Sequence, residues 1–212
     1  MKSTFRLGLL TGALSVVSVA ALHAQTSWPR FGGEQGNFTT AEKGIPQTWD
    51  ASDVNWRKDL GGIGQSVPVI WDSRLFVATS EQLSDGKVAR FVHCINRADG
   101  KTIWKQQAAT GPGEPLHKMN TWATPSCATD GEVVVAYFGP GGLHCYSVDG
   151  EHQWSLDPVE PSGAWGFAGS PVIVGDQVVQ NCDGEGKSLL LSVNKNTGKE
   201  LWRTERKATP KG

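Results

Sequence analysis

The chain has 212 residues, and 26 of them are Gly, nearly twice the typical usage of roughly 7%. Only 19% of the residues are charged, 11 are Pro, and the formal net charge is -1. This composition excludes a coiled coil, a helical bundle and a disordered tail, and the balanced charge predicts no strong attraction to nucleic acid or to an anionic membrane.

The first 24 residues have the pattern of a secretory signal peptide. Lys2 and Arg6 precede an uncharged stretch over 7–22, and Ala24 is a small residue that suits cleavage. The stretch contains Gly, Thr and Ser and is shorter than the ~20 apolar residues of a membrane-spanning helix. An uncleaved anchor is the alternative. We therefore expect a periplasmic or extracellular protein that has no membrane span after cleavage.

Four tryptophans recur along the chain at a nearly constant interval, as in repeat architectures. They lie 48, 50 and 48 residues apart and are Trp56, Trp104, Trp154 and Trp202. Before each of the last three, a Gly stands four residues upstream, at Gly100, Gly150 and Gly198. Each Gly follows Asp or Thr, which is typical of tight hairpin turns. The Trp residues are thus predicted to lie on strands that begin just after a turn.

Three further runs precede the Trp in each repeat and predict three more strands. The first run contains a Pro and lies at 67–70, 124–127 and 170–173. The second and third runs are short and rich in β-branched or apolar residues, at 74–78 and 90–95, 132–136 and 142–146, and 177–179 and 188–193. Each repeat is therefore expected to form a four-stranded antiparallel sheet whose fourth strand carries the Trp.

Repeated sheets of this size predict a β-propeller, in which commonly about four to eight four-stranded blades stack around an axis. The expected fold is all-β and incomplete, with three full antiparallel blades and an orphan N-terminal closing strand. Each indole would pack on the next blade, where its burial is worth ~2–4 kcal/mol, and the Gly would allow the close approach. A β-sandwich is the alternative, but it gives no reason for a whole unit to repeat.

The repeat boundaries divide the chain into six segments. They are a signal peptide at 1–24, an N-terminal segment at 25–60 with the orphan outer strand of Trp56, blade 1 at 61–107, blade 2 at 108–157, blade 3 at 158–206 and a connector to a missing blade at 207–212. An open arc exposes sheet faces and edges, so remaining blades or a partner chain are expected to close the ring. A partial chain is favoured over a naturally short chain that closes by oligomerisation.

The repeats resemble those of the pyrroloquinoline-quinone (PQQ)-type β-propellers, the quinoprotein alcohol dehydrogenase-like superfamily. That group includes quinoprotein dehydrogenases and a periplasmic outer-membrane assembly lipoprotein. The resemblance covers Trp28 to Arg206 and is carried by a small residue, then Gly, then Trp at the end of each repeat. These trios are Cys94, Gly100 and Trp104, then Cys145, Gly150 and Trp154 with one residue fewer, then Ser192, Gly198 and Trp202. The segments 28–33 and 181–184 also look like secreted PQQ-like repeat proteins.

The four cysteines admit a packing role and a disulfide. Cys94 and Cys145 share the repeat position of Ser192, where a small side chain beside the docking Trp is sufficient, so packing is favoured for these two. Equivalent positions on adjacent blades are too far apart for the ~7 Å that a disulfide allows between Cα atoms. Cys127 and Cys182 lie in different repeats, and a bond between them stays open.

No metal or catalytic site is predicted from the remaining polar residues. His93 and His144 occupy equivalent positions that do not converge on one point, so strand-surface histidines are favoured over metal ligands. The segment 183–186 lacks the spaced oxygen ligands of a calcium loop. The Gly-rich segments 61–64 and 139–142 are followed by no helix, so they are not phosphate loops. No Ser-His-Asp or paired-carboxylate arrangement is visible.

A ligand of a propeller would bind at the channel mouth, on the loops that lead into the innermost strands. These loops are predicted at 111–121 and 158–167. The candidate residues there are His117, Lys118, Asn120, Trp122, Glu160, Trp165 and Phe167. Trp122 and Trp165 stand outside the docking period and have no evident core role, so their indoles either contact a ligand or plug the central channel.

The favoured function is a secreted or periplasmic, non-catalytic propeller that acts as a protein-interaction scaffold, with protein as the expected partner. The resemblance implies one alternative, a PQQ-dependent dehydrogenase that would hold the quinone on a Trp floor and calcium through Glu, Asn and Asp. That activity needs eight blades and a carboxylate cluster, so no cofactor is expected outside this alternative. A second alternative is a carbohydrate-binding propeller in which Trp122 and Trp165 stack on sugar.

Overall fold

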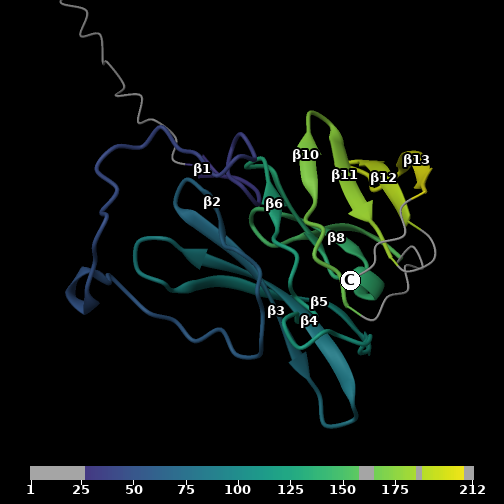
Figure 1. Ribbon diagram of the computed structural model, residues 1–212, viewed down its shortest axis with the longest axis horizontal. Helices are drawn as coiled ribbons and strands as arrows, with labels where there is room; N and C mark the ends of the chain where they lie inside the picture. The colour runs from purple at the N-terminus through teal and green to yellow at the C-terminus, as the bar shows by residue number, and fades with distance from the viewer. Residues whose placement is uncertain (1–26, 158–164, 185–187, 208–212) are drawn as a thin grey trace, which may run out of the picture.

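The computed structural model describes residues 27–157, 165–184 and 188–207, and these form three sheets that follow one another along the chain (Figure 1). The expected signal peptide, the candidate Glu160 and most of the expected connector lie outside the described residues. In the described chain, no helix has the length and apolar character needed to cross a membrane.

All pairings between the strands are antiparallel, and each repeat forms one sheet. The first sheet has the order β1-β2-β3-β4-β5, with β1 (Ser27–Trp28), β2 (Val69–Trp71), β3 (Arg74–Gln82), β4 (Lys87–Asn96) and β5 (Thr102–Pro112). The second contains β6 (Ala128–Thr129), β7 (Val133–Tyr137), β8 (Leu143–Ser147) and β9 (His152–Leu156). The third contains β10 (Val172–Val174), β11 (Gln177–Cys182), β12 (Ser188–Asn194) and β13 (Glu200–Arg206). The predicted set of four-stranded antiparallel repeats is confirmed.

We name β2–β5 blade 1, β6–β9 blade 2 and β10–β13 blade 3. The first strand of blade 2, β6, lies next to the first strands β2 and β10 of its neighbours. Hydroxyl groups join the blades near these strands: Val67 N donates to Ser126 Oγ at 2.9 Å, and Ser126 N donates to Ser170 Oγ at 3.0 Å. The inner strands of successive blades are therefore linked through one serine per junction.

The N-terminal segment leaves Trp56 without strand partners, in agreement with its expected orphan position. Residues 54–60 around Trp56 pair with no strand in the described part of the chain. A different segment adds a strand: β1 pairs with β2, with Ser27 opposite Trp71. Thr129 N in β6 also donates to Pro29 O at 2.8 Å. The start of the described chain thus lies against the inner strands of blades 1 and 2. Besides the strands, the part of the chain that the structure describes contains two short 3-10 helices, η1 (Ala51–Asp53) and η2 (Gly139–Gly141).

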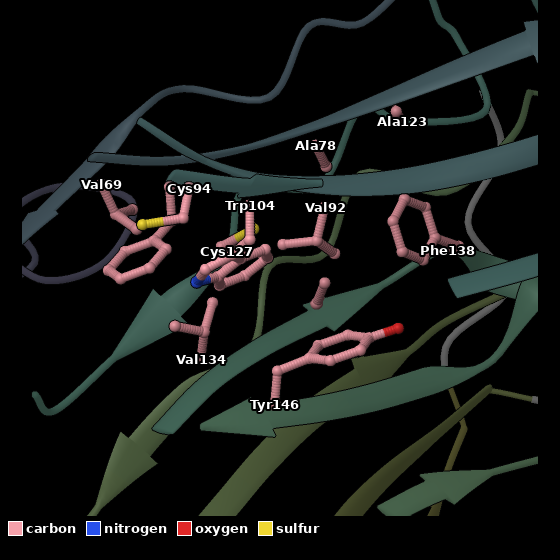
Figure 2. Packing of buried hydrophobic residues seen from close by; sticks show 12 residues of the cluster. Val69, Ala78, Val92, Cys94, Trp104, Ala123, Cys127, Val134, Phe138 and Tyr146 are labelled. Carbon is pink, nitrogen blue, oxygen red and sulfur yellow. The ribbon is translucent and has the colours of Figure 1, made fainter. Parts of the chain in front are cut away.

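The hydrophobic cores lie between the sheets. The first core joins residues of blades 1 and 2, and Figure 2 shows Trp104 among them. It consists of Val69, Phe76, Ala78, Val92, Cys94, Trp104, Ala123, Cys127, Val134, Ala136, Phe138 and Tyr146. The second core joins blades 2 and 3 and consists of Val133, Val135, Tyr137, Leu143, Cys145, Trp154, Phe167, Val178, Cys182, Leu189, Leu191 and Val193.

Blade 2 lies between the other two blades and buries both of its faces. Successive side chains of a strand point to opposite faces of the sheet. In β7, Val134 and Ala136 therefore enter the first core, whereas Val133, Val135 and Tyr137 enter the second. This double burial explains why the strand is an uninterrupted apolar run rather than an alternating one.

Candidate functional site

The period of tryptophans is a set of contacts between blades. The indole Nε1 atoms donate to carbonyl oxygens of the next repeat, from Trp56 to Arg97 at 2.9 Å, from Trp104 to Val148 at 2.9 Å and from Trp154 to Lys195 at 2.6 Å. The acceptor residues are held in turn by their own N–H groups, which donate to the carbonyls of Ser73, Glu132 and Asp176 at 2.8, 3.1 and 2.9 Å. Each indole therefore binds a carbonyl group whose residue is already held by a backbone hydrogen bond within the next repeat.

The glycine of each repeat makes room for the ring that docks on it. Gly100, Gly150 and Gly198 have φ values of +70°, +94° and +68°, which L side chains rarely adopt. A Cβ atom on these residues would lie 2.6, 2.8 and 2.7 Å from the docked indole. The predicted docking role of the three glycines and of Trp56, Trp104 and Trp154 is thus seen directly.

The fourth tryptophan is in a different setting. Trp202 is 38% exposed, against 9% for Trp104 and 6% for Trp154. Its Nε1 donates to Gln177 Oε1 of its own blade at 3.3 Å. Within the described residues no further turn covers this indole, so Trp202 has the docking position without the docking partner.

Two loops meet at one end of blades 1 and 2 and bring together three of the predicted channel-mouth residues. The rings of His117 and Trp165 stack, with centroids 4.4 Å apart and planes at 29°. Asn120 Nδ2 donates to Trp165 O at 2.6 Å. A Cβ on Gly166 would lie 2.7 Å from Leu116 Cδ2, so the Leu116 side chain packs directly on the backbone of Gly166. We call residues 116–120 with 165–166 the loop platform.

The loop platform presents large apolar side chains to solvent. Trp165 is 41% exposed and Met119 is 69% exposed. The Met119 backbone is itself tied down, because its carbonyl accepts a hydrogen bond of 2.5 Å from Gln65 Nε2. An exposed Trp and Met thus stand on loops that several hydrogen bonds hold in place.

Trp122 does not join the loop platform. Its Nε1 donates to Glu114 O at 3.0 Å, and a Cβ on Gly113 would lie 3.0 Å from its ring. It lines a separate hollow of about 510 Å³ together with Gly62 and Glu81. Phe167, in the other loop, is buried in the second core. Phe167 is therefore a core residue, and Trp122 is held by the loop segment that precedes it.

The histidines are buried, which corrects the expectation of strand-surface residues. His93 Nε2 lies 2.8 Å from Thr79 Oγ1, and burial lowers the pKa of His93 to about 4. His144 Nε2 lies 2.7 Å from Gly141 O, and burial lowers its pKa as well. Both rings are neutral near pH 7, because desolvation disfavours the charged form. The alternation of each strand places His93 and His144 on the sheet face opposite Cys94 and Cys145, and both rings are buried there.

A buried ion pair lies where the loop platform meets blade 1. Arg90 Nη2 lies 2.6 Å from Glu114 Oε2, and the Arg90 side chain is almost completely buried. Burial raises the pKa of Glu114, while Arg90 opposes that rise. The pair borders a hollow of about 410 Å³ that His144 and Asp157 also line. Since each charge has the other as partner, the pair holds β4 to the loop that follows β5.

All four cysteines are buried free thiols. Cys94 and Cys145 lie opposite Trp104 and Trp154 in their strand pairs, which supports the predicted packing role. Cys127 belongs to the first core and Cys182 to the second. The two residues are separate free thiols and form no disulfide with each other. Burial raises the pKa of Cys127 to about 12, which leaves it unreactive.

The acidic residues and histidines of the described segments do not gather into a metal-ligand cluster. In 27–157, 165–184 and 188–207, no group of three or more His, Cys, Asp and Glu side chains could hold a metal ion. Asp183, in the segment compared with a calcium loop, pairs instead with Arg206 at 2.5 Å. The exposed Trp165 has the His117 ring stacked against one face of its indole.

Comparison with solved structures shows the propeller fold. The quinohemoprotein alcohol dehydrogenase ADHIIG from Pseudomonas putida HK5 matches with 20% identity and a TM-score of 0.51, over 71% of this chain and 22% of that one. A europium-containing methanol dehydrogenase matches with 11% identity and a TM-score of 0.49, over 70% and 27%. BamB from Moraxella catarrhalis matches with 14% identity and a TM-score of 0.41, over 70% and 51%. The chain therefore spans about a quarter of the length of the two dehydrogenases and about half of that BamB.

Sequence comparison identifies the family. A search of curated protein sequences gave no match. A family model described as outer membrane protein assembly factor BamB matches residues 17–147 and again residues 48–212, so the two matches together span 17–212 and overlap at 48–147. The overlapping matches follow from the repeats, since the same model fits the chain in two registers. Together with the docked tryptophans and the four-stranded blades, this match shows that the chain belongs to the BamB family of PQQ-like β-propeller repeat proteins.

Proposed function

We propose that this chain is a non-catalytic propeller of the periplasm or the extracellular space that binds another protein through the loop platform. The observation that carries the proposal is the exposure of Trp165 and Met119 on loops that Asn120 and the stacked His117 hold together. The family model, which is named for an outer membrane protein assembly factor, supports a role in contacts between proteins.

The physical chemistry of the platform favours a protein partner. Aromatic residues and Met are enriched in the buried centres of protein interfaces, where one large side chain supplies much contact area. The hydrogen bonds of Asn120 and Gln65 fix the loop backbones before any partner arrives. Binding then loses less conformational entropy than it would with mobile loops. The loop platform is thus already ordered before a partner binds. The neighbouring carboxylate of Glu114 forms an ion pair with Arg90.

A site-specific cross-linking experiment tests this function. A photoreactive amino acid is placed at Met119 of the full chain, in cells that make and export it, and the same group at the exposed Val174 on blade 3 serves as control. We expect position 119 to form an adduct with one protein, and this adduct should be lost when Trp165→Ala is added. In the reciprocal experiment, a photoreactive group placed on that protein should form an adduct with this chain. Cell fractionation should find the product outside the cytoplasm.

Two further measurements oppose the alternatives directly. The purified chain is reconstituted with PQQ and calcium and assayed for dye reduction. Turnover would contradict the scaffold function and support a dehydrogenase. Binding to a glycan array that disappears in Trp165→Ala but persists in Trp122→Ala would replace the protein partner with a carbohydrate. Equal cross-linking at positions 119 and 174, or an adduct that survives Trp165→Ala, would also contradict the proposal.

A further inference from the structure

The hollow that Trp122 lines belongs to neither the loop platform nor the two hydrophobic cores. It has a volume of about 510 Å³, and its walls come from the segment 61–63, from residues 80–82 at the end of β3 and from Trp122. This volume lies in the range of small-molecule sites. We call it the Trp122 hollow. Its walls all belong to blade 1 or to the loops that lead into blades 1 and 2.

One wall of the Trp122 hollow is a tryptophan that is held in a fixed position. Trp122 Nε1 donates to Glu114 O at 3.0 Å, and the ring packs against Gly113, where an added Cβ would lie 3.0 Å from Trp122 Cζ2. The side chain is nevertheless partly exposed. An indole anchored in this way offers a flat apolar surface, and it loses little conformational entropy when a ligand packs on it.

A second wall, the segment 61–63, is equally well ordered. Ile63 N donates to Ser80 O and Ser80 N donates to Ile63 O, both at 2.8 Å. Gly62 has a φ of +70°, and a Cβ on this residue would clash with Ser80 O, so glycine is required for the close approach. Gly61 N donates to Asp59 Oδ1 at 2.8 Å. The hollow is therefore formed before any ligand arrives.

Polar and apolar side chains stand together around the Trp122 hollow. Lys105 Nζ lies 3.0 Å from Glu81 Oε1, which holds the carboxylate in place and leaves Oε2 as a further acceptor. Gln82 is exposed and adds an amide that both donates and accepts hydrogen bonds. Ile63, which is 50% exposed, adds an aliphatic surface. The lining thus combines an aromatic ring, an aliphatic group, a charged acceptor and an amide.

These groups match the two kinds of surface on a sugar ring. A pyranose has a face of C–H groups that can pack on an indole, and a rim of hydroxyl groups that hydrogen-bond to carboxylate and amide side chains. A wholly apolar ligand would cover the Glu81 carboxylate without offering it a donor, which is costly. An anionic ligand would be repelled by Glu81, whose neighbour Lys105 is already paired. A neutral sugar satisfies every group of the lining.

We propose that the Trp122 hollow binds a neutral oligosaccharide. One pyranose ring stacks on the indole of Trp122, its hydroxyl groups donate to the Glu81 carboxylate, and others form hydrogen bonds with the Gln82 amide. This binding uses neither Trp165 nor Met119, so it is independent of the proposed function. Single substitutions can therefore separate the sugar site from the loop platform.

The test is a glycan array that carries neutral and acidic di- to tetrasaccharides and is probed with the full chain. Titration calorimetry then measures the dissociation constant of the neutral glycan that gives the strongest signal. We expect Trp122→Ala to raise this constant about tenfold or more, because the ring loses its stacking surface. Glu81→Gln should raise it about tenfold, because a neutral amide accepts weaker hydrogen bonds than a carboxylate.

Two indoles elsewhere serve as matched controls. Trp165→Ala lies in the loop platform, and Trp49→Ala removes a side chain that is 80% exposed. Both variants should bind the glycan as the wild type does. The proposal would be overturned by an array without any neutral glycan bound, by binding that survives Trp122→Ala, or by acidic glycans bound as tightly as neutral ones. Binding lost only in Trp165→Ala would place the sugar on the loop platform and would also contradict it.

Further variants guard against loss of folding. Trp122→Phe keeps an aromatic ring beside Gly113 and should weaken binding less than Trp122→Ala. Urea unfolding shows whether each variant keeps the wild-type midpoint, and Glu81→Gln with both the midpoint and the affinity of the wild type would contradict the assigned acceptor. The cross-link from position 119 should persist in Trp122→Ala and in Glu81→Gln, so failure of the sugar site and failure of the protein site give different results.

Discussion

The junction between blades 2 and 3 and the outer face of blade 3 use the same kind of residues in two different environments. At the junction, Trp154 is 6% exposed and donates to Lys195 O at 2.6 Å. On the outer face, Trp202 is 38% exposed and bonds only within its own blade. The repeat position therefore determines where an indole points, while its contribution to stability depends on whether a glycine turn covers it.

The largest expected effect comes from removing a covered indole. Trp154→Ala should lower the free energy of unfolding by about 3–5 kcal/mol, because it empties the centre of the second core and leaves the Lys195 carbonyl without its donor. Urea unfolding followed by circular dichroism measures the change. A loss of unfolding free energy no greater than that of Trp202→Ala would show that packing under the next blade does not determine how much an indole stabilises the chain.

The glycine under the indole comes next. Gly198→Ala should cost about 2–3 kcal/mol, because the new Cβ would lie 2.7 Å from the Trp154 ring and φ is +68°. Gly175→Ala is the matched control, since its φ is +56° but no atom lies within 4 Å of the added Cβ. The control should lose only the backbone part, about 1–2 kcal/mol. Equal losses of unfolding free energy in the two variants would show that the contact between residue 198 and the Trp154 ring has no effect on stability.

Acid should destabilise blade 1 through His93 in β4. Its pKa of about 4 in the folded chain lies below the ordinary value of 6.5, because the ring is buried. Between these pH values the unfolded chain binds a proton that the folded chain does not, so stability falls as the pH drops from 6.5 toward 4. The loss is on the order of 1–2 kcal/mol.

The measurement compares the urea midpoint at pH 7 with that at pH 5. The charges of Lys105 and Lys58 add to the lowering of the His93 pKa, and the charge of Glu81 opposes it. His93→Gln, whose side-chain amide still offers Thr79 a hydrogen-bonding partner, should reduce the difference between the two midpoints. His144 keeps part of it, since its pKa is also lowered. A pH dependence that His93→Gln leaves unchanged would exclude His93 as its source.

The smallest effect is expected at the uncovered indole. Trp202→Ala should lower the stability of the single chain by about 1 kcal/mol or less, because the residue is partly exposed and its hydrogen bond is long. Urea unfolding at low protein concentration, followed by circular dichroism, measures the change. A loss comparable with that of Trp154→Ala would mean that Trp202 is covered after all.

The channel-mouth residues show how far sequence reasoning reaches. Trp122 and Trp165 looked alike, since both precede a Pro and stand outside the period. In the folded chain Trp122 is held by Glu114 and Gly113, while Trp165 stacks on His117 and is exposed. The sequence contains no local signal for this difference, because both sets of contacts depend on how two distant loops meet.

The sequence by itself determined the repeats, the four strands of each blade and the docking of three tryptophans, because turn chemistry and strand alternation act over a few residues and recur at a fixed period. Only the tertiary structure decided that β1 pairs with β2, that the histidines are buried, that the cysteines stay apart and that Trp202 is uncovered. Each of these outcomes depends on which surfaces meet across tens of residues, and short-range propensities carry no information about such meetings.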